Sequence, residues 1–82
     1  NYTKALEFYL KAVTIYEQLN EPERCARLYN NIGVLYQSQQ AYGKALTYFT
    51  KTEKLLKDPN DPVLGVTYTN IGNALVGQKQ YT

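Results

Sequence analysis

Apolar side chains recur along this chain at the three- and four-residue intervals of a helix. In residues 2–19 they occupy one such stripe, made of Ala5, Leu6, Tyr9, Ala12, Val13 and Tyr16. The stripe returns in residues 42–57 at Ala45, Leu46, Phe49, Thr52 and Leu56. Because this spacing places the side chains on one helix face, the pattern predicts two amphipathic helices that each bury one side.

Two further helices of a second kind are predicted over residues 21–38 and 62–78. Each has a proline at its start, Pro22 and Pro62, where the missing N–H is tolerated and the fixed φ suits a first turn. With no alternating strand pattern between them, the four segments predict an all-α fold of antiparallel helical hairpins.

Polar residues mark where the second kind of helix begins. Asn20 and Asp61 directly precede the prolines, and both residue types are favoured N-caps because their side chains accept backbone N–H bonds. Glu23 stands three residues after Asn20, which predicts a capping box.

Three short polar segments are predicted to separate the helices. Residues 37–42 (QSQQAY) and 76–81 (VGQKQY) are interpreted as turns. The spacer at residues 57–61 contains Pro59, which disfavours a helical conformation at Asp58.

The sequence repeats itself. Between residues 1–22 and 41–62 the offset is 40, and the identities are Tyr2/Tyr42, Lys4/Lys44, Ala5/Ala45, Leu6/Leu46, Lys11/Lys51, Asn20/Asn60 and Pro22/Pro62. After Pro62 the offset becomes 39, with the identities Tyr29/Tyr68, Asn31/Asn70, Ile32/Ile71, Gly33/Gly72, Gln39/Gln78 and Tyr42/Tyr81. Because these identities occur in the same order in both segments, they indicate two copies of one unit, which is typical of a repeat architecture.

Charged residues are interpreted mainly as a solvated surface. A glutamate precedes a cation by four residues in Glu7–Lys11, Glu23–Arg27 and Glu53–Lys57, a spacing that supports a helix by a few tenths of a kcal/mol. A net charge of +2 is too small to indicate nucleic acid or an anionic membrane as partner.

Length and composition are those of a small globular unit. The 82 residues are 44% hydrophobic and 20% charged, which suits one small domain or a slice of a larger array. No run approaches the roughly 20 apolar residues of a membrane span, and no signal peptide is visible. The chain opens with Asn1, so we expect an excised piece of a longer protein, with the cytoplasm as the default location.

Catalytic chemistry is not expected. The chain has no histidine, so the commonest general base and metal ligand is missing. The single cysteine, Cys25, has no histidine to activate it and is interpreted as a small buried or half-buried thiol. No glycine-rich phosphate loop occurs, and the acidic residues are scattered. The sequence therefore predicts a non-enzyme without cofactor or metal.

The aromatic and small residues form a recognisable motif. Its members are Tyr29, Ile32, Gly33, Tyr36, Tyr42, Ala45 and Phe49, then Tyr68, Ile71, Gly72, Leu75 and Tyr81, preceded by Tyr2, Ala5, Tyr9 and Ala12. This pattern resembles the tetratricopeptide repeat and covers essentially the whole chain. The resemblance implies a right-handed α-solenoid over residues 1–82. In that frame residues 2–19 are the second helix of one repeat, 21–57 a full repeat, and 62–82 the first helix and turn of the next.

Two features depart from the common family pattern. Thr52 replaces a usual small alanine, and the period of 39–40 residues exceeds the family's usual length of about 34. The longer period is similar to that of the LGN/Pins-type regulators of cell polarity and of kinesin light chains, which defines the predicted subclass.

The resemblance also implies a binding surface, because the first helices of successive repeats line a concave groove for a peptide or partner helix. The corresponding face of residues 21–38 carries Arg27, Asn30, Asn31, Val34, Gln37 and Ser38. On residues 62–78 it carries Val66, Thr69, Asn70, Asn73, Val76 and Gly77. Within these sets, the predicted partner-binding residues are Arg27, Asn30, Asn31, Val34, Gln37, Thr69, Asn70 and Asn73.

Asparagine is the characteristic residue of this face. An amide donates and accepts hydrogen bonds, so Asn31 and Asn70 are expected to pair with the backbone of an extended partner. The alternative is that these amides bond across to a neighbouring helix or to their own turn. In the LGN-like resemblance, the arginine matching Arg27 faces acidic partner residues.

The chaperone-binding class of the family is disfavoured. Its clamp for a terminal carboxylate requires Lys and Asn where this chain has Asn30 and Val34, and only Asn70 matches.

We therefore expect a protein–protein interaction scaffold that binds an extended peptide or partner helix. One alternative is a structural spacer or self-assembling segment, because solenoids need about three repeats with polar caps and this chain could form a homo-oligomer through uncapped apolar ends. A weaker alternative is a peptide-sensing array of an intracellular signalling protein.

Overall fold

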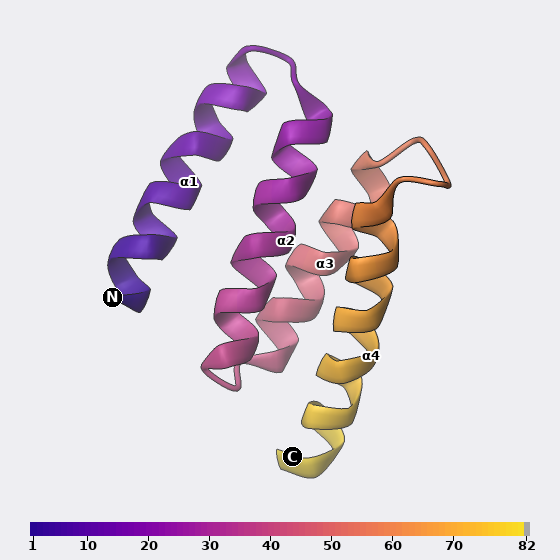
Figure 1. The fold of residues 1–82 in the computed structure, drawn as a ribbon. Coiled ribbons are helices and arrows are strands. Elements are labelled where there is room, and N and C mark those ends of the chain that lie inside the picture. The colour runs from indigo at the N-terminus through magenta and orange to yellow at the C-terminus, as the bar shows by residue number, and fades with distance from the viewer. Residues whose placement is uncertain (82) are drawn as a thin grey trace.

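Four antiparallel helices make up the computed structural model, which describes residues 1–81. They are α1 (Tyr2–Gln18), α2 (Pro22–Ser38), α3 (Tyr42–Leu55) and α4 (Pro62–Tyr81). Figure 1 shows α1 and α4 flanking the central hairpin of α2 and α3, with both marked ends of the chain at the same end of the bundle. No strand occurs among the described residues, and the predicted all-α hairpin architecture is confirmed.

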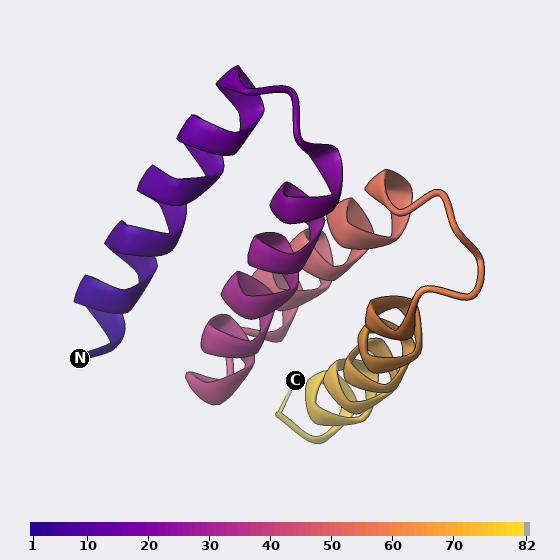
Figure 2. The same cartoon turned by 45° about the horizontal axis from the view of Figure 1, so that its top comes forward.

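The helices pack in two unequal layers. The hairpin of α2 and α3 has the most extensive interface, α1 covers one side of α2, and α4 covers α3. In addition, α2 and α4 contact each other. Within the described chain, no Cα atom of α1 lies within 8 Å of one in α3 or α4. In Figure 2, α1 lies beside α2 and apart from α3 and α4. The layer formed by α2 and α4 is thus closed, whereas the layer formed by α1 and α3 is open.

The first two connections use the same turn. Asn20 and Gln40 have φ values of 57° and 60°, and the residue after each donates its N–H to a carbonyl five positions back. These bonds run from Glu21 to Tyr16 and from Ala41 to Tyr36, both at 2.9 Å. This is the Schellman arrangement that ends a helix.

Asn20 therefore belongs to the turn that terminates α1, and its predicted role as the N-cap of α2 is wrong. A turn this short must reverse the chain through a left-handed residue, a conformation that asparagine tolerates better than most. The N-cap of α2 is Glu21, which makes no side-chain capping bond, so the predicted capping box with Glu23 is also wrong.

Asp61 caps α4 as predicted. Its Oδ1 accepts the N–H of Val63 at 2.9 Å, which satisfies one of the free donors in the first turn. At the preceding boundary α3 ends at Leu55, two residues before its predicted end at residue 57.

The predicted turn over residues 76–81 is wrong, because α4 continues through it to Tyr81. Gly77, which lies within this segment, has no positive φ. It is instead buried against the Tyr42 ring, where any Cβ would overlap the ring atoms. Glycine is required here for the close approach of a neighbouring aromatic side chain.

Small residues let α2, α3 and α4 pack closely. One cluster joins Ala26, Leu56 and Leu64, and another joins Ala45, Phe49 and Ala74. At Gly33 an added Cβ would lie only 2.5 Å from Phe49 Cε1, so the absence of a side chain here allows α3 to pack closely against α2.

Thr52 has a definite place in the same core. Its side chain is fully buried, and Oγ1 donates to the carbonyl of Ala26 at 3.0 Å while lying 3.1 Å from that of Tyr48. The threonine that departs from the family's usual alanine therefore adds a polar tie between α3 and α2.

Of the three predicted ion pairs, Glu7–Lys11 forms, with 3.4 Å between Lys11 Nζ and Glu7 Oε1. Neither of the other two forms in the described structure, where Glu21 pairs with Arg24 instead and Lys57 lies beyond the end of α3.

Candidate functional site

The predicted partner-binding residues lie on α2 and α4, and most of them are exposed. Arg27, Asn31 and Val34 project outward from α2, as do Thr69 and Asn73 from α4. With their exposed neighbours they form a surface that we name the α2–α4 face, made of Arg27, Asn31, Val34, Ser38, Val66, Thr69, Asn73 and Val76. The face combines amide and hydroxyl groups with three valines.

Asn30 does not belong to this exposed surface. Its residue is only 8% exposed, and its Oδ1 accepts a hydrogen bond from the buried Thr67 hydroxyl at 3.0 Å. A buried polar pair of this kind stabilises the fold because each group replaces the water that the other has lost. Asn30 ties α2 to α4, which is the interhelical role that the sequence left open for these amides.

Asn70 takes part in the same bridge. It is half-buried, and its Nδ2 lies 3.5 Å from Asn30 Oδ1, at the outer limit of a hydrogen bond. Asn31, its sequence counterpart in the first copy, is exposed. Two matched asparagines therefore occupy different environments, and Asn70 points toward α2.

Two other positions of the predicted groove face are less accessible than these. Gln37 is half-buried and Gly77 is buried. The Thr69 hydroxyl donates to the carbonyl of Gly65 at 3.1 Å within its own helix, which leaves its methyl group for outward contacts.

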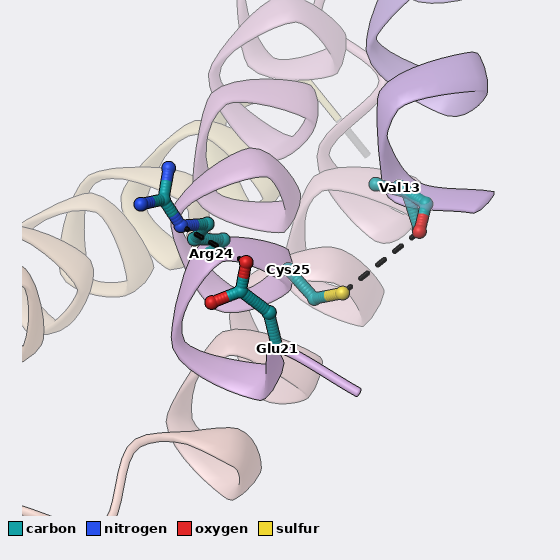
Figure 3. A network of polar contacts seen from close by, with 4 residues as sticks. All are labelled: Val13, Glu21, Arg24 and Cys25. Carbon is teal, nitrogen blue, oxygen red and sulfur yellow. Dashed lines mark hydrogen bonds and ion pairs between the residues drawn. The ribbon is translucent and has the colours of Figure 1, made fainter. Parts of the chain in front are cut away.

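Arg27 lies at the edge of the α2–α4 face. It lines a cavity of about 620 Å³ with Tyr16, Asn20, Glu21, Pro22, Glu23 and Arg24. Arg24 is paired with Glu21 at 3.4 Å (Figure 3). Among the described residues no carboxylate lies within ion-pair distance of Arg27, so its charge is available to a partner.

Four tyrosines of α1, α2 and α3 form a second group, which the sequence did not predict. Tyr2, Tyr36, Tyr48 and Tyr29 follow one another at centroid distances of 6.3, 5.6 and 5.8 Å. We name this set the tyrosine row. All four rings are half-buried. Their grouping depends on contacts between three helices and was not visible in the sequence.

The row ends at a carboxylate. Tyr29 donates its hydroxyl to Glu17 Oε2 at 3.1 Å. Burial raises the pKa of Tyr29 to about 12, and the hydrogen bond to Glu17 and its charge act in the same direction. Burial also raises the pKa of Tyr48. Both phenols therefore remain neutral hydrogen-bonding groups at physiological pH.

Cys25 is a buried thiol, as predicted. Its residue is 3% exposed, and Sγ lies 3.9 Å from the carbonyl oxygen of Val13 on α1, toward which it points in Figure 3. Burial raises the thiol pKa, and the nearby carboxylates of Glu17 and Glu21 raise it further. A thiol held in its protonated form is a poor nucleophile.

The described chain offers no cluster of three or more metal-ligating side chains. Nor is any of its helices both long and apolar enough to cross a bilayer.

A family model for the tetratricopeptide repeat matches residues 1–58, and the chain therefore belongs to this family. Comparisons with curated proteins and with solved structures gave no significant match. Tetratricopeptide repeats are a non-catalytic fold that generally mediates protein–protein interactions. The family prediction is confirmed, whereas the long-period subclass and the division into individual repeats stay predictions.

Proposed function

We propose that this chain holds an extended segment of a partner protein on the α2–α4 face. The observation that supports this most directly is the buried bond between Asn30 and Thr67. Because it ties α2 to α4, the exposed residues of both helices share one surface.

The chemistry of the face suits an extended backbone. Asn31 on α2 and Asn73 on α4 are exposed amides, and each can donate to a carbonyl and accept from an N–H of a bound chain. Val34, Val66 and Val76 are 43%, 53% and 58% exposed and supply apolar contact. Arg27 adds selectivity for an acidic residue at one edge.

A displayed library of random peptides provides the test. Peptides selected on the chain should lose about tenfold or more in affinity when Asn31→Ala and Asn73→Ala are combined, since two net hydrogen bonds contribute about 1–3 kcal/mol. Fluorescence anisotropy measures the affinity, and circular dichroism verifies that the helices persist.

Gln18→Ala is the matched control, because it removes an exposed amide from α1, away from the proposed site. Unchanged affinity in the folded double variant would rule out this binding mode. Asn70→Ala is tested separately, since Asn70 also contacts Asn30.

Self-association is a second candidate function, favoured by the environment of Gly72. In the first repeat Gly33 lies against Phe49, whereas nothing lies within 4 Å of a Cβ built at Gly72. Tyr68 and Leu75 beside it are 52% and 53% exposed. We propose that this face of α4 can receive a helix of the same kind as α3.

The α1 helix of a second copy provides such a helix. Tyr9 of α1 is the sequence counterpart of Phe49 at the offset of 40 residues, so it would contact Gly72 as Phe49 contacts Gly33. The neighbouring stripe of α1 is also exposed at Phe8, Ile15 and Leu19.

Light scattering across a concentration series tests this candidate. We expect the apparent mass to rise with concentration and Gly72→Arg to abolish the rise, because the long charged side chain would block the docking position. A single monomer mass at all concentrations would contradict self-association and leave the peptide-binding proposal intact.

A further inference from the structure

The open layer contains a cleft that is separate from the α2–α4 face. Its volume is about 390 Å³, and it is lined by Glu17, Asn20, Glu21, Pro22, Cys25, Tyr29, Lys51, Lys54 and Leu55. The close-up in Figure 3 shows Glu21 and Cys25 of this region. Tyr29 in the cleft and Asn31 on the α2–α4 face are two residues apart, so they point about 160° apart around a helix of 3.6 residues per turn.

The interior of this cleft suits an apolar side chain. Pro22, Leu55 and the Tyr29 ring contribute carbon surface, and the buried Cys25 thiol adds a weakly polar group. A volume of this size lies at the lower end of the range for sites that bind small molecules or side chains. An aliphatic side chain would displace water there without leaving a charged group unsolvated.

Lysines of α3 follow the tyrosine row away from the cleft. Lys51 Nζ lies 5.3 Å from the centroid of the Tyr29 ring and 5.0 Å from that of Tyr48. Lys44 Nζ lies 5.6 Å from the Tyr36 ring. Attraction between an ammonium group and an aromatic face therefore holds both lysines over the row and reduces the side-chain freedom that ligand binding would otherwise remove.

These lysines have no acidic partner of their own. Within residues 1–81 no carboxylate lies within ion-pair distance of Lys44, Lys51 or Lys54. The rings attract the ammonium groups but carry no net charge, so three positive charges along one side of the row remain uncompensated. Carboxylates of a partner would complement them.

The spacing of the lysines sets a register for that partner. Lys44 and Lys51 are seven residues apart on α3, which corresponds to about 10.5 Å along a helix. An extended peptide in the polyproline II conformation advances about 3.1 Å per residue and returns to the same side every three residues, so carboxylates three residues apart would meet both ammonium groups.

We propose that the cleft and the tyrosine row form a second docking surface, which binds an extended acidic peptide. One aliphatic side chain of the peptide occupies the cleft, and two carboxylates three residues apart pair with Lys51 and Lys44. This surface lies on the opposite side of α2 from the proposed peptide site, so the chain could engage two partner segments at once.

Two carboxylates near α1 restrict which anionic ligands this surface can bind. Glu17 is bonded to Tyr29, and Glu21 also lines the cleft. Both repel a ligand that is uniformly anionic, whereas an extended peptide can present its acidic side chains to α3 alone. The arrangement therefore favours an acidic peptide over a phosphate polymer such as nucleic acid.

A synthetic peptide that reads the same in both directions provides the probe, since the direction of binding is not specified. Its side-chain order is Ser-Glu-Ser-Ser-Glu-Leu-Glu-Ser-Ser-Glu-Ser, with a fluorescein label. We expect saturable binding in fluorescence anisotropy and at least tenfold weaker binding when lysine replaces every glutamate or serine replaces the leucine. Absence of saturable binding, or an altered peptide that binds as tightly as the parent probe, would overturn the proposal.

Variants of the chain locate the site. Lys51→Glu should weaken the probe at least tenfold, whereas Lys79→Glu, on exposed α4 surface, should change affinity less than threefold. Circular dichroism verifies that both variants keep their helices. Equal losses in the two variants would show only general charge attraction and would overturn the assigned site.

Two further measurements test whether the two surfaces bind independently and whether the glutamates of the peptide are spaced as proposed. The combined Asn31→Ala and Asn73→Ala variant should bind the probe with unchanged affinity; a loss would place the probe on the α2–α4 face instead. A probe without its outer glutamates should be insensitive to Lys44→Glu, whereas the full probe should lose about threefold or more. Equal sensitivity would contradict the spacing of three residues.

Discussion

Two nearly identical pieces of sequence, YNNIG in α2 and YTNIG in α4, occupy different environments. Ile32 and Gly33 are buried in α2, while Ile71 is half-buried and Gly72 is exposed in α4. The difference arises from the neighbours: α2 has helices on three sides, whereas α4 contacts α3 and the edge of α2. A repeat motif thus specifies which face can pack, and an adjacent helix decides whether that face is buried.

Substitution of the glycine in each motif should show the largest difference between the two environments. Gly33→Ala places a Cβ 2.5 Å from the ring of Phe49, which is fully buried, and overpacking of this kind costs about 1–3 kcal/mol. Gly72→Ala meets no neighbour within 4 Å and should stabilise the helix by about 0.5–1 kcal/mol. Urea unfolding of both variants measures the opposite signs; equal effects would contradict the assigned packing.

The residues that precede the two repeated asparagines should show a smaller contrast. Asn30→Ala removes the buried acceptor of the Thr67 hydroxyl and should cost about 1–3 kcal/mol. Its counterpart at the offset of 39 residues is Thr69, which is exposed, so Thr69→Ala should remain within about 0.5 kcal/mol of the parent. Thermal unfolding at neutral pH measures both. If Asn30→Ala proves as mild as Thr69→Ala, the bridge between α2 and α4 contributes little.

The tyrosine that opens the repeated stretch should produce the smallest effect, and only at high pH. The pKa of Tyr29 is raised to about 12 in the folded chain, so between about pH 10 and 12 the unfolded chain loses this proton first. Stability linked to Tyr29 is therefore complete below pH 10 and is lost as pH rises toward 12. Urea unfolding from pH 9 to 12 should show this decline.

Tyr29→Phe should reduce the decline because it removes the ionisable group, although part of the slope remains since the pKa of Tyr48 is also raised. An identical slope in Tyr29→Phe would contradict the assigned environment of the phenol. Glu17→Gln tests the effect of the carboxylate charge on the pKa of Tyr29, because it removes the charge beside the hydroxyl while keeping a hydrogen-bond acceptor.

Much of the fold could be predicted because its signals are local. Periodic apolar positions predicted α1 and α3, and the prolines marked where α2 and α4 begin. The errors occurred where one residue type serves two purposes. Asn20 can cap the next helix or follow the end of the previous one, and residues 76–81 can form a turn or continue α4. The surroundings of these residues in three dimensions decided between the two roles.

The candidate site was predictable to a lesser degree. Its location on α2 and α4 followed from the repeat motif, but the separate roles of the amides did not. Asn30, one residue from the exposed Asn31, is buried because Thr67 of α4 lies against it. The cleft of the open layer was not predicted, since α1, α2 and α3 together create it.

By itself the sequence determined the repeat, the helical segments and the family, because these depend on spacing along one chain. Only the tertiary structure decided which copy of the motif is buried, which asparagine is exposed and where tyrosines and lysines meet. The physical reason is that burial and charge compensation depend on neighbours from other helices, and the same five-residue stretch meets different neighbours in α2 and in α4.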